Sequence, residues 1–140
     1  MPIVALDFGE RRIGVAVSDP TEKFALPLRT IVRSDVRADV DEILEIAREH
    51  GAETIVVGHP LRLSGQAGPA AEKAAAFAGI LRKAFAGAVE LVDERMTTAL
   101  ATRALLAADV SRAKRKRVVD QLAAASILET FLARKRARSE

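Results

Sequence analysis

A strand, a glycine turn and a second strand at the start of the chain constrain the fold more than any other stretch. Residues 3–6 are an unbroken apolar run, which predicts a strand buried on both faces. Asp7 ends that run, Gly9 allows the backbone to turn, and residues 13–17 return as a second strand. A carboxylate carried inward by a buried strand is costly unless a cation or a full set of hydrogen bonds meets it. Asp7 is therefore either part of a cation or phosphate site or an acceptor for the amides of the turn.

Apolar spacing and turn residues predict the elements that follow. Residues 25–32 predict a third strand, and the short connections make the first three strands an antiparallel meander. The pattern then predicts a helix over 35–50, a strand over 54–57, a helix over 69–86, a strand over 89–92, and helices over 97–108 and 114–134. This order, β-β-β-α-β-α-β-α-α, predicts an α/β fold with a mixed five-stranded sheet and helices on both faces.

Composition excludes several kinds of site and partner. The chain has no Cys, which excludes disulfides, thiolate metal sites and a cysteine nucleophile. Trp and Tyr are absent, so extensive aromatic stacking on nucleic-acid bases is not available. No apolar run has the length of a membrane span and no basic leader precedes the first strand, so we expect a cytoplasmic protein. With 140 residues, we expect one domain over 1–134 and a mobile basic tail over 135–140.

Basic residues are concentrated at the end of the chain. Residues 111–140 hold nine Lys and Arg against three acids, on a body with a small negative charge. This asymmetry suggests a polyanionic partner, although a solvated helix and a frayed tail would carry the same charges. A phosphate chain that reaches Asp120 would cross the basic cluster just before it, so we expect this cluster to bind nucleic acid. The basic cluster is Lys114, Arg115, Lys116 and Arg117.

Acidic residues stand at three positions that the pattern marks as interior or strand-terminal: Asp7, the pair Asp93 and Glu94, and Asp120. Asp7 and Glu94 would end neighbouring strands at one edge of the sheet if both strands run parallel. Asp120 either pairs with a basic residue one turn back on its helix or converges with the other acids. Converging carboxylates repel one another and suit Mg²⁺ or Mn²⁺. Two such ions can activate water and stabilise the leaving oxygen of a phosphodiester.

Four motifs follow one another along the chain. They are Asp7-Phe8-Gly9 with Arg12-Ile13-Gly14-Val15-Ala16 and Ser18-Asp19, then Val56-Val57-Gly58-x-Pro60, then Asp93-Glu94-Arg95-x-Thr97-Thr98, then Val119-Asp120-x-x-Ala123-Ala124. In this order they resemble the YqgF (RuvX) family of bacterial RNase H-like proteins, which is related to the Holliday junction resolvase RuvC. The resemblance implies an RNase H-like fold and a metal-dependent nuclease site. It also implies a role in maturing the precursor of small-subunit ribosomal RNA, with junction-resolving activity in some members.

The resemblance also implies which residues carry the site. Asp7, Glu94 and Asp120 become the catalytic, metal-binding acids, and Glu94 is preferred to Asp93 because the family motif stresses the acid before the arginine. Three arginines join the basic cluster as candidates for substrate binding, and the full set is Arg12, Arg62, Arg95, Lys114, Arg115, Lys116 and Arg117. Arg12 and Arg95 are equally suited to hold a nearby carboxylate, and for Arg12 we favour that structural role.

The central loop over 61–68 departs from the family pattern. His59 stands where relatives usually have an apolar residue between Gly and Pro. Leu63-Ser64-Gly65 stands where they often carry Met-Asp-Gly, so any contribution of that Asp to metal or substrate binding is absent. His59 either caps the end of its strand or orients a phosphate or water.

Three functions remain open from the sequence. The first is a two-metal endonuclease acting on structured RNA, at the end of pre-16S rRNA, or on branched DNA as a junction resolvase. The second is an ATP-binding module, which is disfavoured because such proteins close two domains around the nucleotide. The third is a non-catalytic RNA-binding factor. A junction resolvase would work as a homodimer, whereas an RNA-trimming enzyme could be a monomer.

Overall fold

The computed structural model of the protein describes residues 1–62, 64–96 and 113–139. Its strands are β1 (Ile3–Phe8), β2 (Arg12–Ser18), β3 (Ala25–Val32), β4 (Thr54–His59) and β5 (Ala88–Asp93). Its helices are α1 (Val36–His50), α2 (Pro69–Ala84), the 3₁₀ helix η1 (Glu94–Met96) and α4 (Ala113–Ser139). The helix predicted over 97–108 lies outside the described residues. No described helix combines the length and the apolar character needed to cross a membrane.

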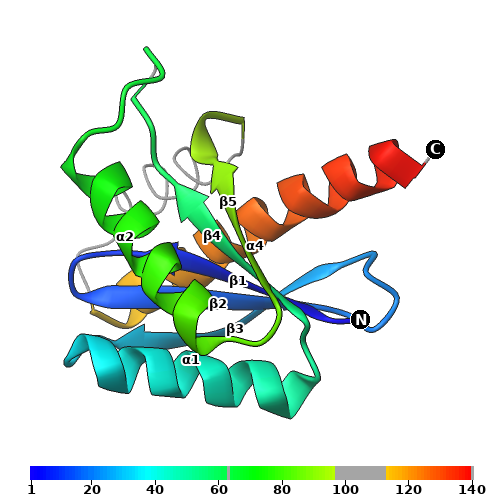
Figure 1. Cartoon of the computed structure of the whole chain (residues 1–140), viewed down its shortest axis with the longest axis horizontal. Coiled ribbons are helices and arrows are strands. Elements are labelled where there is room, and N and C mark those ends of the chain that lie inside the picture. The colour runs from blue at the N-terminus through cyan, green and yellow to red at the C-terminus, as the bar shows by residue number, and fades with distance from the viewer. Residues whose placement is uncertain (63, 97–112, 140) are drawn as a thin grey trace.

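The five strands form one mixed sheet in the order β3-β2-β1-β4-β5 (Figure 1). β1, β2 and β3 pair antiparallel, as the short connections predict, and β4 and β5 run parallel to β1. The predicted mixed sheet is therefore confirmed. One prediction is wrong: the strands that lead to Asp7 and Glu94 are not neighbours, because β4 lies between β1 and β5. Asp7 and Glu94 thus lie at the same edge of the sheet, although β1 and β5 are not hydrogen-bonded to each other.

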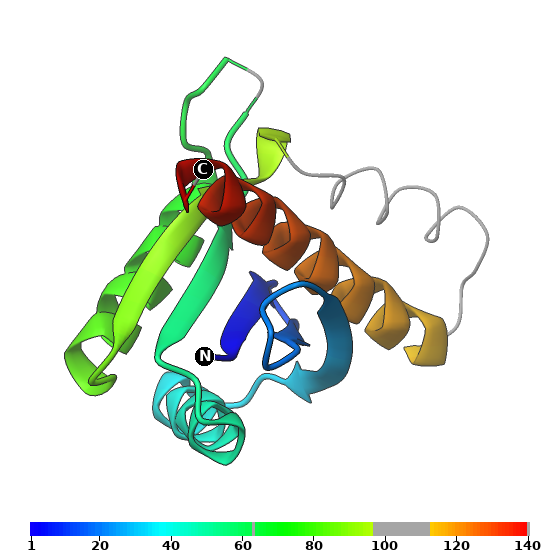
Figure 2. The same ribbon diagram turned by 90° about the vertical axis from the view of Figure 1, so that its right-hand side faces the viewer.

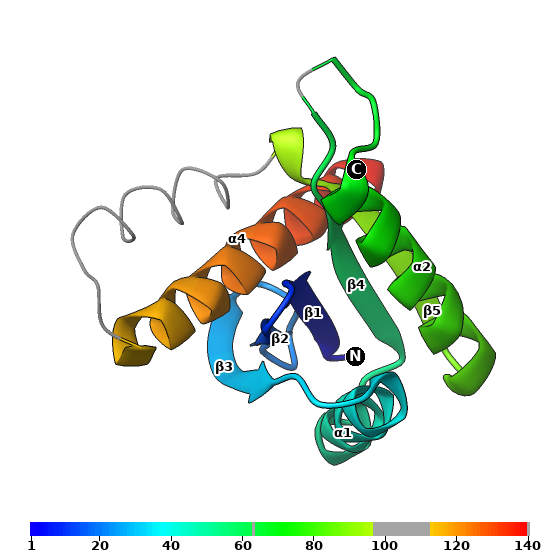
Figure 3. The same ribbon diagram turned by 90° about the vertical axis from the view of Figure 1, so that its left-hand side faces the viewer.

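Helices cover both faces of this sheet, as predicted (Figures 2 and 3). α1 and α2 pack on one face, and the long α4 crosses the other. Side chains alternate along β1: Ile3 and Ala5 join the core under α4, whereas Val4 and Leu6 join the core under α1 and α2. By the same alternation, Asp7 faces α4.

Capping residues fix both ends of α1, for which the sequence offers Ser34 or Asp35 at the start and Gly51 at the end. The Asp35 carboxylate accepts a hydrogen bond from the Ala38 backbone N–H at 2.8 Å, which satisfies one free amide of the first turn. Gly51 ends the helix with φ of +65°, a left-handed conformation that glycine adopts without strain. Helical spacing places Val36 on one apolar face with Val40 and Ile43, but Val36 is 39% exposed, whereas Val40 and Ile43 are buried.

Helix α4 is longer than predicted, and one residue of its predicted core face is exposed. It continues to Ser139, so residues 135–139 belong to this helix. Lys135 is 2.5 Å from Glu22 and anchors this end on the β2–β3 turn. Helical spacing predicts a core face of Val118, Leu122, Ala125, Phe131 and Leu132. Ala125 and Leu132 are buried, whereas Val118 is 49% exposed and the next residue, Val119, is buried.

Two motif residues, Ser18 and Asp19, hold the start of the chain and the β2–β3 turn. The Ser18 hydroxyl accepts a hydrogen bond from the Ile3 backbone N–H at 2.7 Å. Asp19 accepts hydrogen bonds from the Thr21 hydroxyl and from backbone N–H groups of the turn, including that of Phe24 at 2.7 Å. These bonds, that of Thr21 first, lower the pKa of Asp19 to about 2. Both residues are explained by structure alone.

Candidate active site

Asp7 lies between two glycines on the neighbouring strands. Its side chain is nearly buried, 6% exposed, and Gly14 of β2 is its partner in the antiparallel register. On the other side of β1, Leu6 pairs with Val57, which places Gly58 of β4 beside Asp7. Because glycine has no side chain, other groups can come close to both flanks of Asp7 on the face that α4 covers.

Glu94 lies against Gly58, in the space that a side chain there would occupy. It is the first residue of η1, directly after β5, and is 2% exposed. A Cβ on Gly58 would lie 3.0 Å from Glu94 Oε2 and would also overlap Ile127 of α4. The buried carboxylate of Glu94 therefore lies over the strand that adjoins Asp7.

Asp93, the alternative to Glu94, has a different partner. Arg95 Nη2 lies 2.6 Å from Asp93 Oδ2, and both side chains are partly exposed. The hydrogen bond from the Arg95 guanidinium lowers the pKa of the Asp93 carboxyl. The burial of Glu94 beside Gly58 and the engagement of Asp93 with Arg95 support Glu94 as the second acid of the site.

Asp120 reaches the site from α4, over Gly14. A Cβ on Gly14 would overlap the backbone carbonyl of Asp120, so only glycine lets α4 approach β2 this closely. The Asp120 carboxylate accepts a hydrogen bond from Arg12 Nε at 2.7 Å in a partly buried ion pair. Arg12 thus has the structural role favoured from the sequence, and it holds Asp120 across the helix–sheet interface.

The three acids approach the carboxyl end of β1 from three elements: β1, η1 and α4. Within residues 1–62, 64–96 and 113–139, no group of three or more His, Asp or Glu is close enough to hold one metal ion. The donors nevertheless fit a hard divalent cation, because all three are carboxylates, and the two glycines let Glu94 and the backbone of Asp120 lie close to the strands beside Asp7. The described side chains thus provide suitable donors, with Asp120 directed at Arg12.

Two predicted substrate-binding arginines lie against the loop over 61–68: Arg62 belongs to the loop and Arg95 to η1. A Cβ on Gly68 would lie 2.9 Å from Arg62 Nε, and one on Gly65 would lie 3.3 Å from Arg95 Nη1. Both arginines are exposed, and the loop follows β4 at the same sheet edge as the acids. A phosphate could therefore reach Arg62 directly, whereas at Arg95 it would share the guanidinium with Asp93.

The basic cluster and His59 are placed only in part. Lys114, Arg115, Lys116 and Arg117 are on the first turns of α4, before Asp120 as predicted, but their side chains lie outside what the structure describes. His59 ends β4, opposite Asp93 in the register, and its carbonyl accepts a hydrogen bond from the Leu61 N–H at 2.9 Å. A phosphate-orienting role for His59 stays a prediction.

Sequence reasoning missed Arg33, which ties the turn after Asp7 to the end of β3. Arg33 Nη1 donates to the Gly9 carbonyl at 3.1 Å and to the Glu10 carbonyl at 3.2 Å. Arg33 Nε lies 3.4 Å from Asp39, a fully buried acid in the first turn of α1. Acids in a first turn normally indicate dipole compensation, so the pattern contained no signal for this contact.

The chain matches a known family over almost its whole length. Residues 1–134 match the model of RuvX, described as a Holliday junction resolvase. The chain belongs to the RuvX family. Relatives from Clostridium perfringens and Pelotomaculum thermopropionicum carry the name "Putative pre-16S rRNA nuclease". The Clostridium relative is 46% identical over 134 residues, which cover 96% of this chain and 98% of the relative. The Pelotomaculum relative is 48% identical over 133 residues, which cover 94% of this chain and 86% of the relative.

A solved structure shows the same fold. T. thermophilus RuvC in complex with a Holliday junction substrate superposes with a TM-score of 0.58 at 18% identity, over 96% of both chains. At that identity, the likeness to RuvC shows the fold alone. The family, the RNase H-like fold class and the nuclease class predicted from the four motifs are thereby confirmed for this RuvX member.

Proposed function

We propose that this RuvX-family nuclease processes the end of pre-16S rRNA in the cytoplasm during ribosome biogenesis, as one nuclease domain over 1–134. The observation that carries the proposal is the approach of Asp7, Glu94 and Asp120 to the carboxyl end of β1, which glycines flank on both neighbouring strands. The relatives' printed name supports the choice of substrate. Hydrolysis of a phosphodiester is the chemistry that such a set of carboxylates serves.

In this mechanism the three acids would hold two Mg²⁺ or Mn²⁺ ions. When bound, these ions would supply an activated water and charge stabilisation at the leaving oxygen. Gly14 and Gly58 let Asp120 and Glu94 come close to the strand end that carries Asp7, and Arg12 holds the Asp120 carboxylate. Each of these residues contributes by positioning the acids, because a reacting group that is out of place lowers the rate of cleavage even when it is present.

The basic residues define a path for the nucleic-acid strand. The basic cluster precedes Asp120 on α4, and Arg62 and Arg95 lie on the other side of the acids, at the loop after β4. A strand crossing the edge of the sheet would meet cations before and after the acids. Such contacts to phosphates position the substrate without reading its sequence.

Two other functions have a specific observation behind them. The family description and the fold shared with RuvC favour a Holliday junction resolvase, which would work as a symmetric homodimer. The Arg12–Asp120 ion pair favours a non-catalytic RNA-binding factor, because it engages one of the three acids. Substrate choice and metal dependence separate these functions from the proposal.

The test of the proposed function is cleavage of two labelled substrates by the full chain. One is a precursor fragment spanning a 16S rRNA end, and the other is a four-way DNA junction, each with Mg²⁺, with Mn²⁺ and with chelator. We expect metal-dependent cleavage of the RNA. Cleavage of the junction alone would establish the resolvase instead, and binding without cleavage in either metal would establish the non-catalytic factor.

Replacing Lys114, Arg115, Lys116 and Arg117 with Ala should weaken RNA binding and flatten its dependence on salt. Each phosphate that the variant no longer neutralises should reduce the slope of log K against log salt by about 0.7–0.9. The matched control makes the same charge change at the other end of α4: Arg134, Lys135, Arg136 and Arg138 to Ala. The salt dependence of RNA binding by both variants can be measured by filter binding between about 50 and 200 mM salt, a range around physiological ionic strength. Equal slopes for the two variants would show that the basic cluster does not contact the RNA phosphates.

A further inference from the structure

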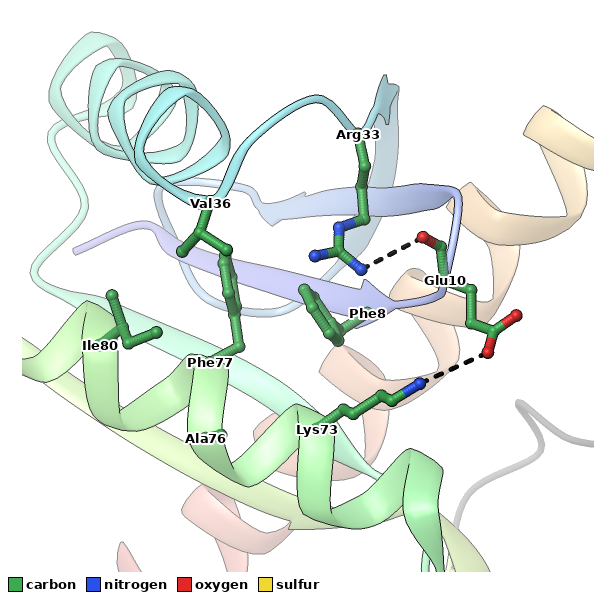
Figure 4. Close-up of a pocket in the computed structure, with 8 residues that line it drawn as sticks. All are labelled: Phe8, Glu10, Arg33, Val36, Lys73, Ala76, Phe77 and Ile80. Carbon is green, nitrogen blue, oxygen red and sulfur yellow. Dashed lines mark hydrogen bonds and ion pairs between the residues drawn. The ribbon is translucent and has the colours of Figure 1, made fainter.

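A groove on the face of the sheet opposite α4 is not used by the nuclease site. Its larger part is a pocket of about 450 Å³ that runs between Val36 at the start of α1 and Ile80 on α2 (Figure 4). Its smaller part, about 70 Å³, reaches Gly9 and Ala70. The two parts share Phe8, Glu10, Arg33 and Lys73. The larger part alone has the volume of a small-molecule site.

One end of the groove is apolar and open. Val36 and Ile80 are 39% and 42% exposed, although both are large aliphatic residues on helices that otherwise bury such side chains. Phe77 is buried between them and stacks on Phe8, with ring centroids 4.4 Å apart. A flat apolar group lying here would remove these side chains from water.

The other end of the groove carries a cation held in a fixed position. The Arg33 guanidinium lies 4.4 Å from the centroid of Phe8 and donates to the carbonyls of Gly9 and Glu10. One terminal nitrogen is directed at Glu10, and the other points away from it, toward the side of the pocket where Val36 lies (Figure 4). A guanidinium already fixed by hydrogen bonds loses little freedom when it binds an anion.

A second cation beside Arg33 is easily released. Lys73 Nζ lies 3.5 Å from Glu10 Oε1, and their side chains are 59% and 82% exposed. An ion pair this exposed contributes little to stability, so a phosphate can replace the Glu10 carboxylate at Lys73. Of the charged side chains that line the groove, Arg33 and Lys73 are basic and Glu10 is acidic, which favours an anion. Asp39 lies outside the lining and offsets part of this charge, because it pairs with Arg33 Nε at 3.4 Å and leaves the terminal nitrogens of Arg33 facing the groove.

We propose that this groove binds one unpaired nucleotide of the substrate strand. Its base lies against Val36, Ala76 and Ile80, and its phosphate lies between Arg33 and Lys73. A base must leave its stack to enter such a pocket, so the nucleotide comes from a single-stranded segment or an end.

The position of the groove relative to the acids supports this assignment. Phe8 follows Asp7 on β1, so the groove and the acids lie on opposite faces of the same strand end. The Gly9 turn lies between them and lines the smaller part of the groove. A strand that crosses this turn can place a phosphodiester at the acids and a neighbouring base in the groove. The assignment rests on the proposed function in taking nucleic acid as the substrate.

The test is a titration of adenosine 5′-monophosphate into the ¹⁵N-labelled full chain, in chelator so that no metal contributes. We expect saturable shifts of the amides over 33–36 and 73–80. Lys73→Glu should weaken binding by about fivefold or more, because it reverses a charge at the phosphate. The matched control, Lys83→Glu, makes the same change on an exposed residue of the same helix and should leave binding unchanged. Ala76→Phe should fill the pocket and remove binding.

Three outcomes would overturn the proposal: no shifts in the groove, equal weakening by Lys73→Glu and Lys83→Glu, or adenosine binding as tightly as its monophosphate. The last would identify an apolar occupant, such as a side chain of a protein partner. The titration needs no cleavage, so it separates the two proposals. If the groove binds the nucleotide but the protein does not cleave RNA, the assignment of the groove stands and the proposed function is refuted. If the protein cleaves RNA but the groove does not bind the nucleotide, the proposed function stands and the assignment of the groove is refuted.

Discussion

Asp7→Asn is expected to lower cleavage by more than about 100-fold, because even the outer partners of metal ligands cost 10–100-fold when they are removed. Asn keeps the shape of Asp7 in its nearly buried position but removes the negative charge that a divalent cation needs. Binding of RNA should stay within about twofold, since phosphate contacts by Lys and Arg dominate affinity. The wild type should also melt at a higher temperature when Mn²⁺ is added, and the variant should lose this increase.

The control for this experiment is Asp41→Asn, an exposed acid on α1 with the same chemical change. It should cleave as the wild type does and keep the Mn²⁺-dependent increase in melting temperature. Retained cleavage by Asp7→Asn would exclude Asp7 from the reaction. The buried carboxylate would then be an element of the turn, the alternative that the sequence left open.

Gly14→Ala is expected to lower the free energy of unfolding by about 2–3 kcal/mol, in the range of overpacked cores. The added Cβ would overlap the Asp120 backbone carbonyl, so the whole of α4 has to move away from β2. That movement also displaces the Asp120 carboxylate, so cleavage should fall even at temperatures where the variant is folded. Denaturant unfolding with unchanged m-value measures the first effect, and cleavage under native conditions measures the second.

Gly79→Ala is the matched control for the steric argument. Gly79 lies inside α2, and a Cβ there would meet nothing within 4 Å. Because Ala favours a helix over Gly, this variant should be more stable by about 0.5–1 kcal/mol. If Gly14→Ala were as stable as the wild type, α4 would be free to shift, and the close approach at Asp120 would not be a requirement of the fold.

Local signals were sufficient where a few neighbouring residues decide the structure. The end of α1 at Gly51 is confirmed, and its N-terminal cap is Asp35, one of the two candidates, Ser34 and Asp35, that the sequence offers. The central position of β1 also follows from its sequence, because the unbroken apolar run over residues 3–6 is typical of a strand covered on both faces.

On α4 the local signals were right about the small residues and wrong about one valine. Three consecutive alanines predict a close approach to the sheet, and Ala123, Ala124 and Ala125 are all buried, whereas Val118, placed on the core face by its spacing, is 49% exposed. Close approach of a helix to a sheet needs small side chains, and a scale of hydrophobicity ranks these below valine. The face of this helix is therefore set by the strands opposite it, which its own sequence does not contain.

The site could be predicted as a set of residues but not as an arrangement. Adjacent acids Asp93 and Glu94 are equivalent in composition, and only the fold buries one and pairs the other with Arg95. The glycines Gly14 and Gly58 belong to the motifs, and glycine inside a strand is the available sign that another group comes close. What comes close, here Asp120 and Glu94, is far away in sequence.

The alternation along β1 makes the length of this strand more constrained than its composition. Asp7 and Phe8 are consecutive, and each serves a different face of the molecule. Inserting or deleting one residue before them would reverse their faces: the Asp7 carboxylate would point into the aliphatic core under α1 and α2, and the Phe8 ring would point toward α4. Point substitutions at either position leave the other in place. The strand can therefore change residue by residue over time, but not in the number of its residues.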